Sequence, residues 1–317
     1  MDASIVSVQG VSHKYERDWA LKNISFTVDR KGIVGLLGSN GAGKSTCMNA
    51  ICGVLHPTRG DITIGGESIR KHPQAAKGNI GFLPQQAPLY ADFTVREYLT
   101  YCGVLRGIRK QRVDASVDRV MRRLGIHHHS NRLIRALSGG YRQRVGIAQS
   151  VIHDPQLVVM DEPTNGLDPN QILSVRTLIR ELAEDHTILL SSHILPEVKA
   201  LCDEVKMIEQ GELIFEGTMG DFESVLAPDK VEIQVRQLPT VEDLRRCFSP
   251  REVDVREGNR FRLEVRGDSD ETEQIARCCL EQGWGLVQIS FERVELEEVF
   301  STLSSTKRSD QSMQESR

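Results

Sequence analysis

One stretch decides the fold of this chain: Gly38-Ser39-Asn40-Gly41-Ala42-Gly43-Lys44-Ser45-Thr46 has the G-x-x-x-x-G-K-[ST] spacing of a phosphate-binding loop. The apolar run at 32–37 before it predicts a short buried strand. Apolar residues after it recur at helical spacing, at Met48, Ile51 and Leu55. The motif therefore stands between a strand and a helix, which is the context that it requires.

The residue types of this loop suit a phosphate chemically. Gly41 and Gly43 permit positive φ, so that successive N–H groups turn inward and form an anion-binding nest. The N-terminus of the following helix adds partial positive charge. We expect Lys44 to contact the β- and γ-phosphates of a nucleotide and the Ser45 hydroxyl to bind Mg²⁺. The alternative, a glycine turn followed by a surface lysine, does not explain the flanking strand and helix.

Length and composition limit the classes of protein to which this chain can belong. It has 317 residues, more than one typical core, and we expect two domains. The net charge of −4 and the lack of a long basic run argue against nucleic acid as a partner. Seven cysteines without metal-ligand spacing are typical of reduced thiols in a cytosolic protein. Because the sequence contains no secretory signal and no apolar run of ~18 residues, we expect another chain to cross any membrane at which this protein acts.

Two further apolar strands lead to residues of catalytic type. The run 157–160 is apolar throughout, as a central parallel strand requires, and is followed by Asp161 and Glu162. There, one carboxylate can hold Mg²⁺ and its neighbour can polarise an attacking water. The strand predicted at 187–190 leads to His193 at the same sheet edge, where ligands gather in open α/β folds. Taken singly, acidic residues at a strand end or a lone histidine are more often structural.

A second anion site is predicted where Ser138, Gly139 and Gly140 open a helix. The serine hydroxyl and the glycine N–H groups are suited to bind a phosphate. A chain with one phosphate-binding loop has no obvious need for another. We therefore expect this second site to serve the nucleotide that is bound to another copy of the chain.

Together these motifs resemble the nucleotide-binding subunits of ATP-binding cassette (ABC) transporters, in that family's order and spacing, from residue 4 to about 220. By this resemblance, 38–46 looks like the Walker A loop, 157–161 like the Walker B strand, and Glu162 like the catalytic carboxylate. Also similar to the family are the signature at Ser138–Gly140, the D-loop at Gly166-Leu167-Asp168, the switch histidine His193, the Q-loop glutamine Gln85 and the adenine-stacking Tyr15. Gln86, directly after Gln85, leaves the Q-loop assignment open by one residue.

The resemblance implies ATP and Mg²⁺ as cofactors. The implied metal ligands are Ser45, Gln85 and Asp161, and the implied catalytic residues are Gln85, Glu162 and His193. Two copies, or this chain and a paralogous ATPase subunit, would close head-to-tail over two ATP molecules, with Asp168 and the signature at the interface. Transmembrane permease subunits would dock on the helical region at about 88–155. The expected location is therefore cytoplasmic, peripheral to the inner face of the membrane.

Within this family, one subfamily is indicated by the segments 137–144 and 165–169. They are similar to the subfamily that serves multidrug, antibiotic, copper-related and gliding-type exporters. Residues 295–300 resemble that subfamily's closing motif. Tyr141 departs from the commonest signature, which has Gln at this position. Two alternatives stay open: an ABC ATPase without a transport role and a nucleotide-dependent regulatory module without catalysis. The sequence lacks the coiled coils and zinc modules typical of the first, and Glu162 argues against the second.

The expected fold is α/β: a P-loop NTPase core of the ABC ATPase type with antiparallel β and helical subdomains, followed by a small α+β, ferredoxin-like C-terminal domain. We assign residues 1–220 to the ATPase domain and 228–303 to the small domain. Residues 304–317 are polar and are predicted to form a disordered tail.

Other elements follow from local patterns. Strands are predicted at 5–8 and 20–28, with 11–15 between them. Thr94 and Glu97 form a capping-box pattern at the start of a helical, arginine-rich region that extends to 153. The run at 127–129 consists of three histidines, and we interpret it as a solvated loop because consecutive side chains diverge.

In the small domain, the order βαββαβ is predicted from alternating strands and two helices. Its expected core consists of Val231, Ile233, Val235, Phe261, Leu263, Val265, Leu286 and Ile289. Phe300 and Leu303 lie three residues apart on the last predicted helix, which they would anchor to that core or to a second subunit. We expect this domain to regulate or stabilise dimerisation.

Overall fold

The computed structural model describes residues 4–29, 31–225, 230–248, 250, 253–264 and 269–291. They fall into two compact units, which divide between Met219 and Gly220. Each unit has a hydrophobic core of its own.

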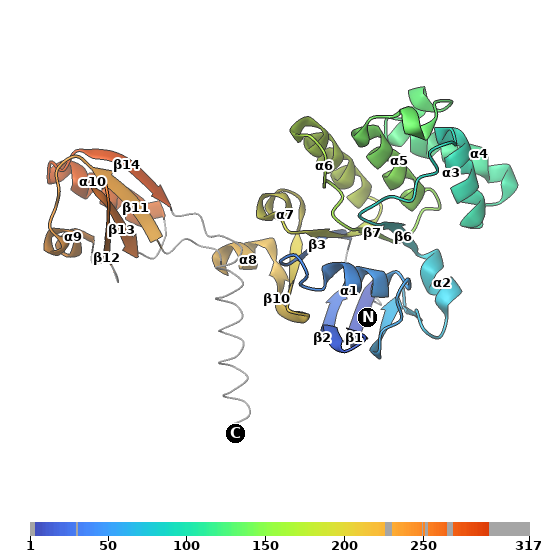
Figure 1. Cartoon of the computed structure of the whole chain (residues 1–317), viewed down its shortest axis with the longest axis horizontal. Coiled ribbons are helices and arrows are strands. Elements are labelled where there is room, and N and C mark those ends of the chain that lie inside the picture. Colours follow the sequence, from blue (N-terminus) through green and yellow to red (C-terminus); the bar gives the residue numbers. More distant parts are fainter. Residues whose placement is uncertain are drawn as a thin grey trace, which may run out of the picture. The chain divides into compact units, whose positions relative to one another are not determined.

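A six-stranded sheet forms the centre of the first unit, in the order β10-β9-β3-β8-β7-β6 (Figure 1). Its strands are β3 (Gly32–Leu37), β6 (Ile80–Leu83), β7 (Leu157–Met160), β8 (Thr187–Ser192), β9 (Glu204–Glu209) and β10 (Glu212–Thr218). All of the pairs except β9–β10 are parallel. Strands β7 and β8 are buried along their whole length, which explains their continuous apolar runs.

A second, antiparallel sheet has the order β2-β1-β4-β5. Its strands are β1 (Val6–Tyr15), β2 (Asp18–Val28), β4 (Arg59–Ile64) and β5 (Glu67–Ser68). Helix α1 (Lys44–Ile51) packs with residues of both sheets in one core. The strand predicted at 20–28 corresponds to β2, whereas the strand predicted at 5–8 was too short, because β1 continues to Tyr15. Irregular pairing between Val8 and Val11, where Gly10 has φ 58°, breaks the alternation on which the prediction relied.

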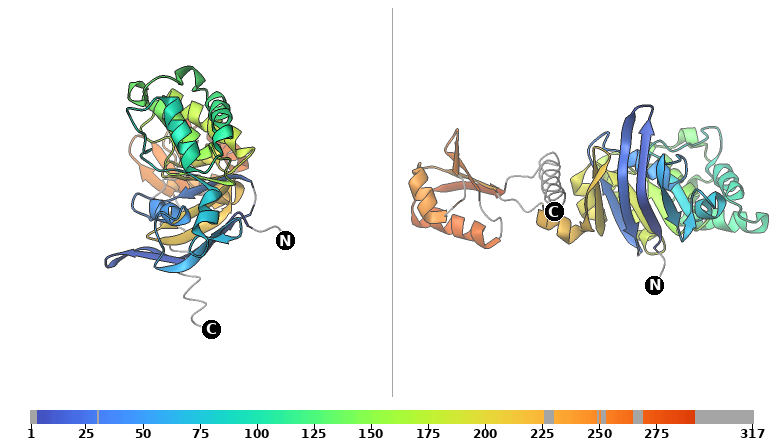
Figure 2. Two further views of the ribbon diagram at one scale, coloured as in Figure 1. Left: turned by 90° about the vertical axis from the view of Figure 1, so that its right-hand side faces the viewer. Right: turned by 90° about the horizontal axis from the view of Figure 1, so that it is seen from below.

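Helices surround this framework. They are α2 (Pro73–Gly78), α3 (Val95–Leu105), α4 (Lys110–Arg123), α5 (Gly139–Val151), α6 (Pro169–Ala183) and α7 (Leu195–Leu201). Figure 1 has α6 and α7 on the opposite side of the main sheet from α1. Helices α3, α4 and α5 contact one another and form a separate lobe, which is green and teal in Figure 2.

The helical lobe contains two of the local features that the sequence singled out, the capping box and the histidine run. The capping box is confirmed: the Glu97 N–H donates to Thr94 Oγ1 at 3.2 Å, and the Thr94 N–H donates to Glu97 Oε2 at 2.8 Å. The histidines at 127–129 form a short 3₁₀ turn in which none is buried. Over the described residues, no group of three or more His, Cys, Asp and Glu side chains is arranged to hold a metal ion.

The second unit has the predicted βαββαβ order. After α8 (Met219–Val225), its elements are β11 (Lys230–Val235), α9 (Val241–Phe248), β12 (Val253–Arg256), β13 (Arg260–Glu264), α10 (Ser269–Glu281) and β14 (Leu286–Phe291). The antiparallel sheet order β12-β13-β11-β14 confirms the ferredoxin-like topology. The two helices contact each other and lie on one face of the sheet (Figure 2).

In the core of the second unit, the residues on the strands agree with the prediction, and the helices contribute further residues that were not predicted. Val231, Ile233, Val235, Phe261 and Leu263 are buried, and Leu286 and Ile289 pack against them partly buried. The core also contains residues that the sequence did not predict: Leu244, Ile275, Cys279 and Trp284. The predictions for Val265, for Phe300 and Leu303, for 295–300 and for the tail at 304–317 lie outside the described residues.

Candidate nucleotide site

The strands that carry the predicted functional residues end side by side. Strand β3 pairs in parallel with β8, so that Leu37 lies opposite Ser192. Strand β8 pairs with β7, and β7 pairs with β6, again in parallel. The loop at 38–46, the pair at 161–162, His193 and Gln85 therefore follow the carboxyl ends of four neighbouring strands. This is the edge at which ligands bind in open α/β sheets.

The loop itself has the backbone that its glycines predict. Gly41 and Gly43 have φ of 83° and 110°, in the left-handed region that side chains disfavour. A Cβ atom at Gly43 would lie 2.6 Å from the carbonyl oxygen of Ala20 on β2, so this position has no room for a side chain. The Lys44 ammonium donates to the carbonyl oxygens of Gly38 and Ser39 at 3.0 and 2.9 Å. The loop is thus wound around a cation at the start of α1.

Acidic residues surround this cation. Lys44 is only 5% exposed, and burial lowers its pKa. The negative charges of Glu162, Asp161 and Glu209 act in the opposite direction and raise it. Glu209, at the end of β9, also accepts hydrogen bonds from the Ser39 hydroxyl at 2.9 and 2.8 Å. No motif predicts this contact, which fixes the loop to the neighbouring strand.

Glu162 is the residue on which most of the polar contacts converge. Its Oε1 accepts from His193 Nδ1 at 2.9 Å, and its Oε2 accepts from Gln85 Nε2 and Asn165 Nδ2, both at 3.2 Å. Its side chain is 12% exposed. Its φ of 47° is unusual for a residue with a long side chain. Strained backbone of this kind clusters at functional sites, where the surrounding structure maintains it.

Ser191 supports both carboxylates, and sequence reasoning assigned it no role. Its hydroxyl is fully buried, donates to Asp161 Oδ1 at 2.5 Å and accepts from the Glu162 N–H at 2.8 Å. The sequence feature that could have indicated this role is the pair of serines, Ser191 and Ser192, at the end of an otherwise apolar strand. A buried hydroxyl needs hydrogen-bond partners, and the carboxylate at the end of the adjacent parallel strand provides one.

A second buried network ties the loop after Glu162 to the end of β8. Glu197 on α7 is 5% exposed and accepts from Thr164 Oγ1 at 2.5 Å and from Ser192 Oγ at 3.0 Å. Arg176 on α6 supplies a positive charge 3.5 Å from the same carboxylate. These four residues come from three different elements and the loop after Glu162 and form no motif, so only the structure reveals the network.

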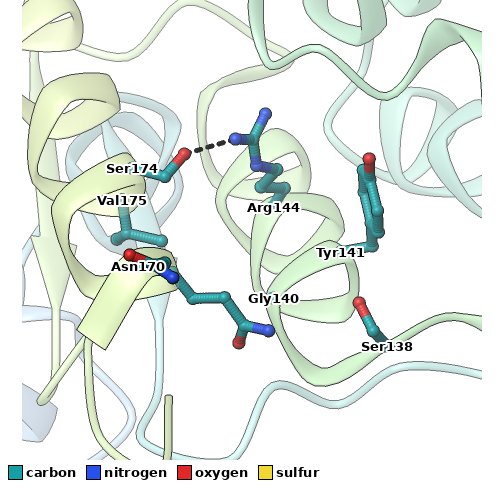
Figure 3. A pocket seen from close by; sticks show the side chains of 8 residues that line it. Ser138, Gly140, Tyr141, Arg144, Asn170, Ser174 and Val175 are labelled. Atoms are coloured by element: carbon teal, nitrogen blue, oxygen red, sulfur yellow. Dashed lines mark hydrogen bonds between the residues drawn. The ribbon is translucent and has the colours of Figure 1, made fainter. Parts of the chain in front are cut away.

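The predicted second anion site lies at the start of α5. Ser138 is the N-cap residue and is exposed, whereas Gly140 is buried against Gln171 of α6. Figure 3 shows the adjoining cavity of about 220 Å³, whose lining residues come from the start of α5 and from α6 and not from the loop at 38–46. Across it, Arg144 donates to Ser174. The exposed face of Ser138 is therefore separate from this chain's own phosphate loop.

Two other residues with predicted functional roles, Asp168 and Tyr15, make contacts within the fold. Asp168 is the N-cap residue of α6, where its Oδ1 accepts from the Gln171 N–H at 3.0 Å. Tyr15 ends β1 half exposed, with its ring edge-on to His13 at a centroid distance of 4.7 Å. The roles predicted for them, at a dimer interface and on an adenine ring, stay predictions.

The residues at this edge fit a nucleotide with Mg²⁺. The left-handed glycines of the loop and the N-terminus of α1 form a cradle that accepts phosphate oxygens. Mg²⁺ in such sites is held by one or two carboxylates together with the phosphates, which is a donor set that Asp161 and the exposed Ser45 hydroxyl can supply. One oxygen of Asp161 is already bonded to Ser191, which leaves the other for a metal ion.

Comparison with known proteins agrees with this geometry. The family model described as "ABC transporter" matches residues 21–165. The chain is 41% identical over 202 residues to the ABC transporter ATP-binding protein NatA of Bacillus subtilis, covering 63% of this chain and 82% of NatA. It is 36% identical over 216 residues to the bacitracin transport ATP-binding protein BcrA of Bacillus licheniformis, covering 68% of this chain and 70% of BcrA.

A solved structure agrees with these relatives. The structure of CbiO1 from Clostridium perfringens, described as part of an ABC transporter complex, superposes with a TM-score of 0.64 at 28% identity. The match covers 70% of this chain and 91% of CbiO1. The chain therefore belongs to the ABC transporter family, as one of its ATP-binding, ATPase subunits.

Proposed function

We propose that this chain hydrolyses ATP with Mg²⁺ at the edge formed by β3, β6, β7 and β8, and that hydrolysis powers export through separate membrane subunits. The observation that carries the proposal is the Glu162 carboxylate, which three side chains orient beside the buried Lys44 ammonium. A structural carboxylate at a strand end does not require a left-handed backbone or three orienting partners.

The side chains suggest a division of labour. Lys44 would bind the β- and γ-phosphates as a charge-assisted donor. Glu162 would accept the proton of the attacking water, and Gln85 and Asn165 would keep its carboxylate aligned. Because His193 uses Nδ1 to contact Glu162, its Nε2 remains to contact the γ-phosphate as charge develops there. Mg²⁺, held by Ser45, Asp161 and Gln85, would neutralise phosphate charge when bound.

A complete site would need a second copy or a paralogous ATPase subunit. The exposed N-terminus of α5, with Ser138 and Gly139, is suited to bind a γ-phosphate, but no residue of this chain's own phosphate loop lines the cavity beside it. Head-to-tail pairing of two chains would bring the α5 N-terminus of one to the loop of the other. Asp168 is the N-cap residue of α6, the helix whose first turn lines this cavity, and would lie at that interface.

Export through membrane subunits is supported by the relatives and by one surface. BcrA is named for bacitracin transport, and CbiO1 is part of a transporter complex. Among the described helices, none is both long and apolar enough to cross a membrane. In the helical lobe, Tyr90 and Tyr101 are 50% and 40% exposed and pack around Phe93 with ring centroids 5.4 to 6.1 Å apart. Exposed aromatic clusters are favoured at protein interfaces, which supports docking of a permease subunit here, at the inner face of the membrane.

We propose that the second unit regulates or stabilises dimerisation. It has its own core, and its sequence carries no motif of the nucleotide site. Its role would therefore be one of assembly, separate from hydrolysis.

Phosphate release by the purified chain tests the enzymatic proposal. Glu162→Gln keeps the shape of the side chain and should lower turnover by about a thousandfold, which is a typical loss for a general base. Glu181→Gln, on the exposed face of α6, is the matched control and should hydrolyse ATP at the wild-type rate. Chelation of Mg²⁺ should abolish the wild-type activity. Equal rates for the two variants would refute the assignment of Glu162.

Copurification tests the transport proposal separately. A tagged chain purified from gently solubilised membranes should carry a permease with several hydrophobic spans. Tyr90→Ala combined with Tyr101→Ala should lose this partner and retain ATPase activity. Purification from the soluble fraction with an active ATPase and no membrane protein would leave the enzyme assignment intact and refute the coupling to export.

A further inference from the structure

A second polar cavity, of about 460 Å³, lies at the edge of the main sheet opposite to the nucleotide site. Gly78, in its wall, ends α2 just before β6 begins, and His153 follows α5 just before β7 begins. Parallel strands therefore start here, whereas the nucleotide loop follows their carboxyl ends. The cavity belongs to no motif of the nucleotide site.

Three arginines line this cavity: Arg106, Arg109 and Arg112. They come from the end of α3, the connecting loop and the first turn of α4 (Figure 1). Two other arginines of this lobe are ion-paired, Arg96 to Asp118 and Arg123 to Asp185. Among the described residues, none of the three in the cavity wall forms an ion pair. Three unneutralised guanidinium groups around one hollow create a strongly positive site.

Arg106 is held in place by the backbone. Its Nη1 donates to the carbonyl oxygens of Ile80 at 3.1 Å and Lys77 at 3.4 Å. Burial lowers the pKa of its guanidinium, but an arginine stays charged in proteins. A guanidinium has five N–H donors, and these contacts use only Nη1. A positioned charge with free donors loses little side-chain entropy when it binds an anion.

His153 presents a buried nitrogen that has no hydrogen-bond partner. Its Nε2 contacts the Ile80 carbonyl oxygen at 3.1 Å and must donate there, while Nδ1 is buried and unpartnered among the described residues. Burial and the charge of Arg106 lower the pKa of His153 to about 4, against the smaller opposing effects of the hydrogen bond to Ile80 and the charge of Asp154. An oxyanion that carries a proton, such as hydrogen phosphate, would donate to the neutral Nδ1.

Helix α4 adds a further attraction for an anion. It runs for 14 residues from Lys110, with Arg109 as its N-cap residue, and no described side chain caps this end. The first N–H groups of a helix lack intrahelical acceptors and carry partial positive charge. The wall of the cavity thus contains three arginines and His153, next to the N-terminus of α4.

We propose that this cavity binds a phosphate group, as a regulatory site separate from the ATP site. Guanidinium groups pair with phosphate through parallel hydrogen bonds, and a hydrogen phosphate also has an O–H that can donate to the imidazole acceptor. The phosphate is that of a small molecule or of an anionic lipid headgroup, two sources that share this chemistry. The proposal does not depend on the export function.

Calorimetry with inorganic phosphate tests the site, with the ATP loop first saturated by a non-hydrolysable ATP analogue and Mg²⁺. The full-length protein should bind one phosphate per chain. Arg109→Ala combined with Arg112→Ala should weaken binding by about tenfold or more for each arginine, since each provides a charge-assisted hydrogen bond. Arg119→Ala combined with Arg122→Ala removes two exposed arginines further along the same helix and should leave binding unchanged.

Vesicle sedimentation distinguishes the two sources. If a lipid headgroup is the ligand, phosphatidic acid vesicles should retain the wild type and the Arg119/Arg122 variant but not the Arg109/Arg112 variant, and phosphatidylcholine vesicles should retain none. Phosphate binding that depends on Arg109 and Arg112, without such retention, supports a small-molecule ligand. Failure of the wild type to bind either probe, or equal losses in the two double variants, would overturn the proposal.

Discussion

Ser191→Ala removes the hydroxyl that bonds both to the Asp161 carboxylate and to the backbone N–H of Glu162. The wild-type oxygen is fully buried, donates to Asp161 at 2.5 Å and accepts from the Glu162 N–H at 2.8 Å. The substitution deletes a hydrogen bond to a charged group and leaves a buried N–H unpaired. A charge-assisted bond contributes about 1.5–3 kcal/mol, and an unsatisfied buried group costs a similar amount.

Because both bonds share one oxygen, we expect the free energy of unfolding to fall by about 2–4 kcal/mol. We also expect kcat to fall by more than it would in a variant that only loses the same amount of stability. Glu162 has a left-handed backbone, which the bond from its N–H helps to maintain. We expect kcat to fall at least tenfold, which corresponds to about 1.4 kcal/mol of transition-state stabilisation.

Ser192→Ala is a closely matched control. Ser192 is also buried, donates to a carboxylate, Glu197, at 3.0 Å, and accepts from a backbone N–H, that of Ile194, at 3.0 Å. Its side chain points to the other face of β8 from that of Ser191. Urea denaturation followed by circular dichroism should give similar losses for the two variants, whereas steady-state phosphate release should drop much further for Ser191→Ala. If the two variants lost the same stability and also had the same kcat, the reasoning would be refuted.

Three further predictions follow from the nucleotide site and the two units. Lys44→Ala should weaken Mg-ATP binding by about tenfold or more and abolish turnover, because a charge-assisted phosphate contact is lost; unchanged ATP titration would refute its role. Ser138→Arg should inactivate the chain on its own, but its mixed dimers with Lys44→Ala should recover ATPase activity through the one intact composite site; a mixture with no more activity than either variant alone would count against action between chains. Truncation after Val225, which keeps α8 whole, should leave a cassette that binds ATP with altered dimer affinity, as measured by calorimetry and gel filtration.

The sequence predicted the residues of the nucleotide site because their motifs follow the strands directly. The glycine loop and the pair at 161–162 each come after an apolar run, and parallel strands necessarily present their carboxyl ends on one edge. What the sequence did not supply was the order of the strands. It was also silent on the long-range contacts, such as Ser191 with Asp161 and Glu209 with Ser39, which link different strands.

Local irregularity explains the other differences. The alternation of β1 breaks at Gly10, and a strand that continues through a bulge therefore looks like two separate segments. In the second unit, strand alternation identified half of the core, while Ile275 and Cys279 lie on one face of a helix whose exposed face carries many charges. The cavity with three arginines combines residues from four segments, and no single segment predicts it.

The central claim is that ATP closes two chains into a dimer that Glu162 then reopens by hydrolysis. Analytical ultracentrifugation of Glu162→Gln with Mg-ATP tests it most directly, because this variant should bind ATP but turn it over too slowly to release its partner. The account predicts a dimer with ATP and a monomer with ADP, and it predicts that Ser138→Arg in the same chain abolishes the dimer. A Glu162→Gln chain that remains monomeric at saturating Mg-ATP would contradict it.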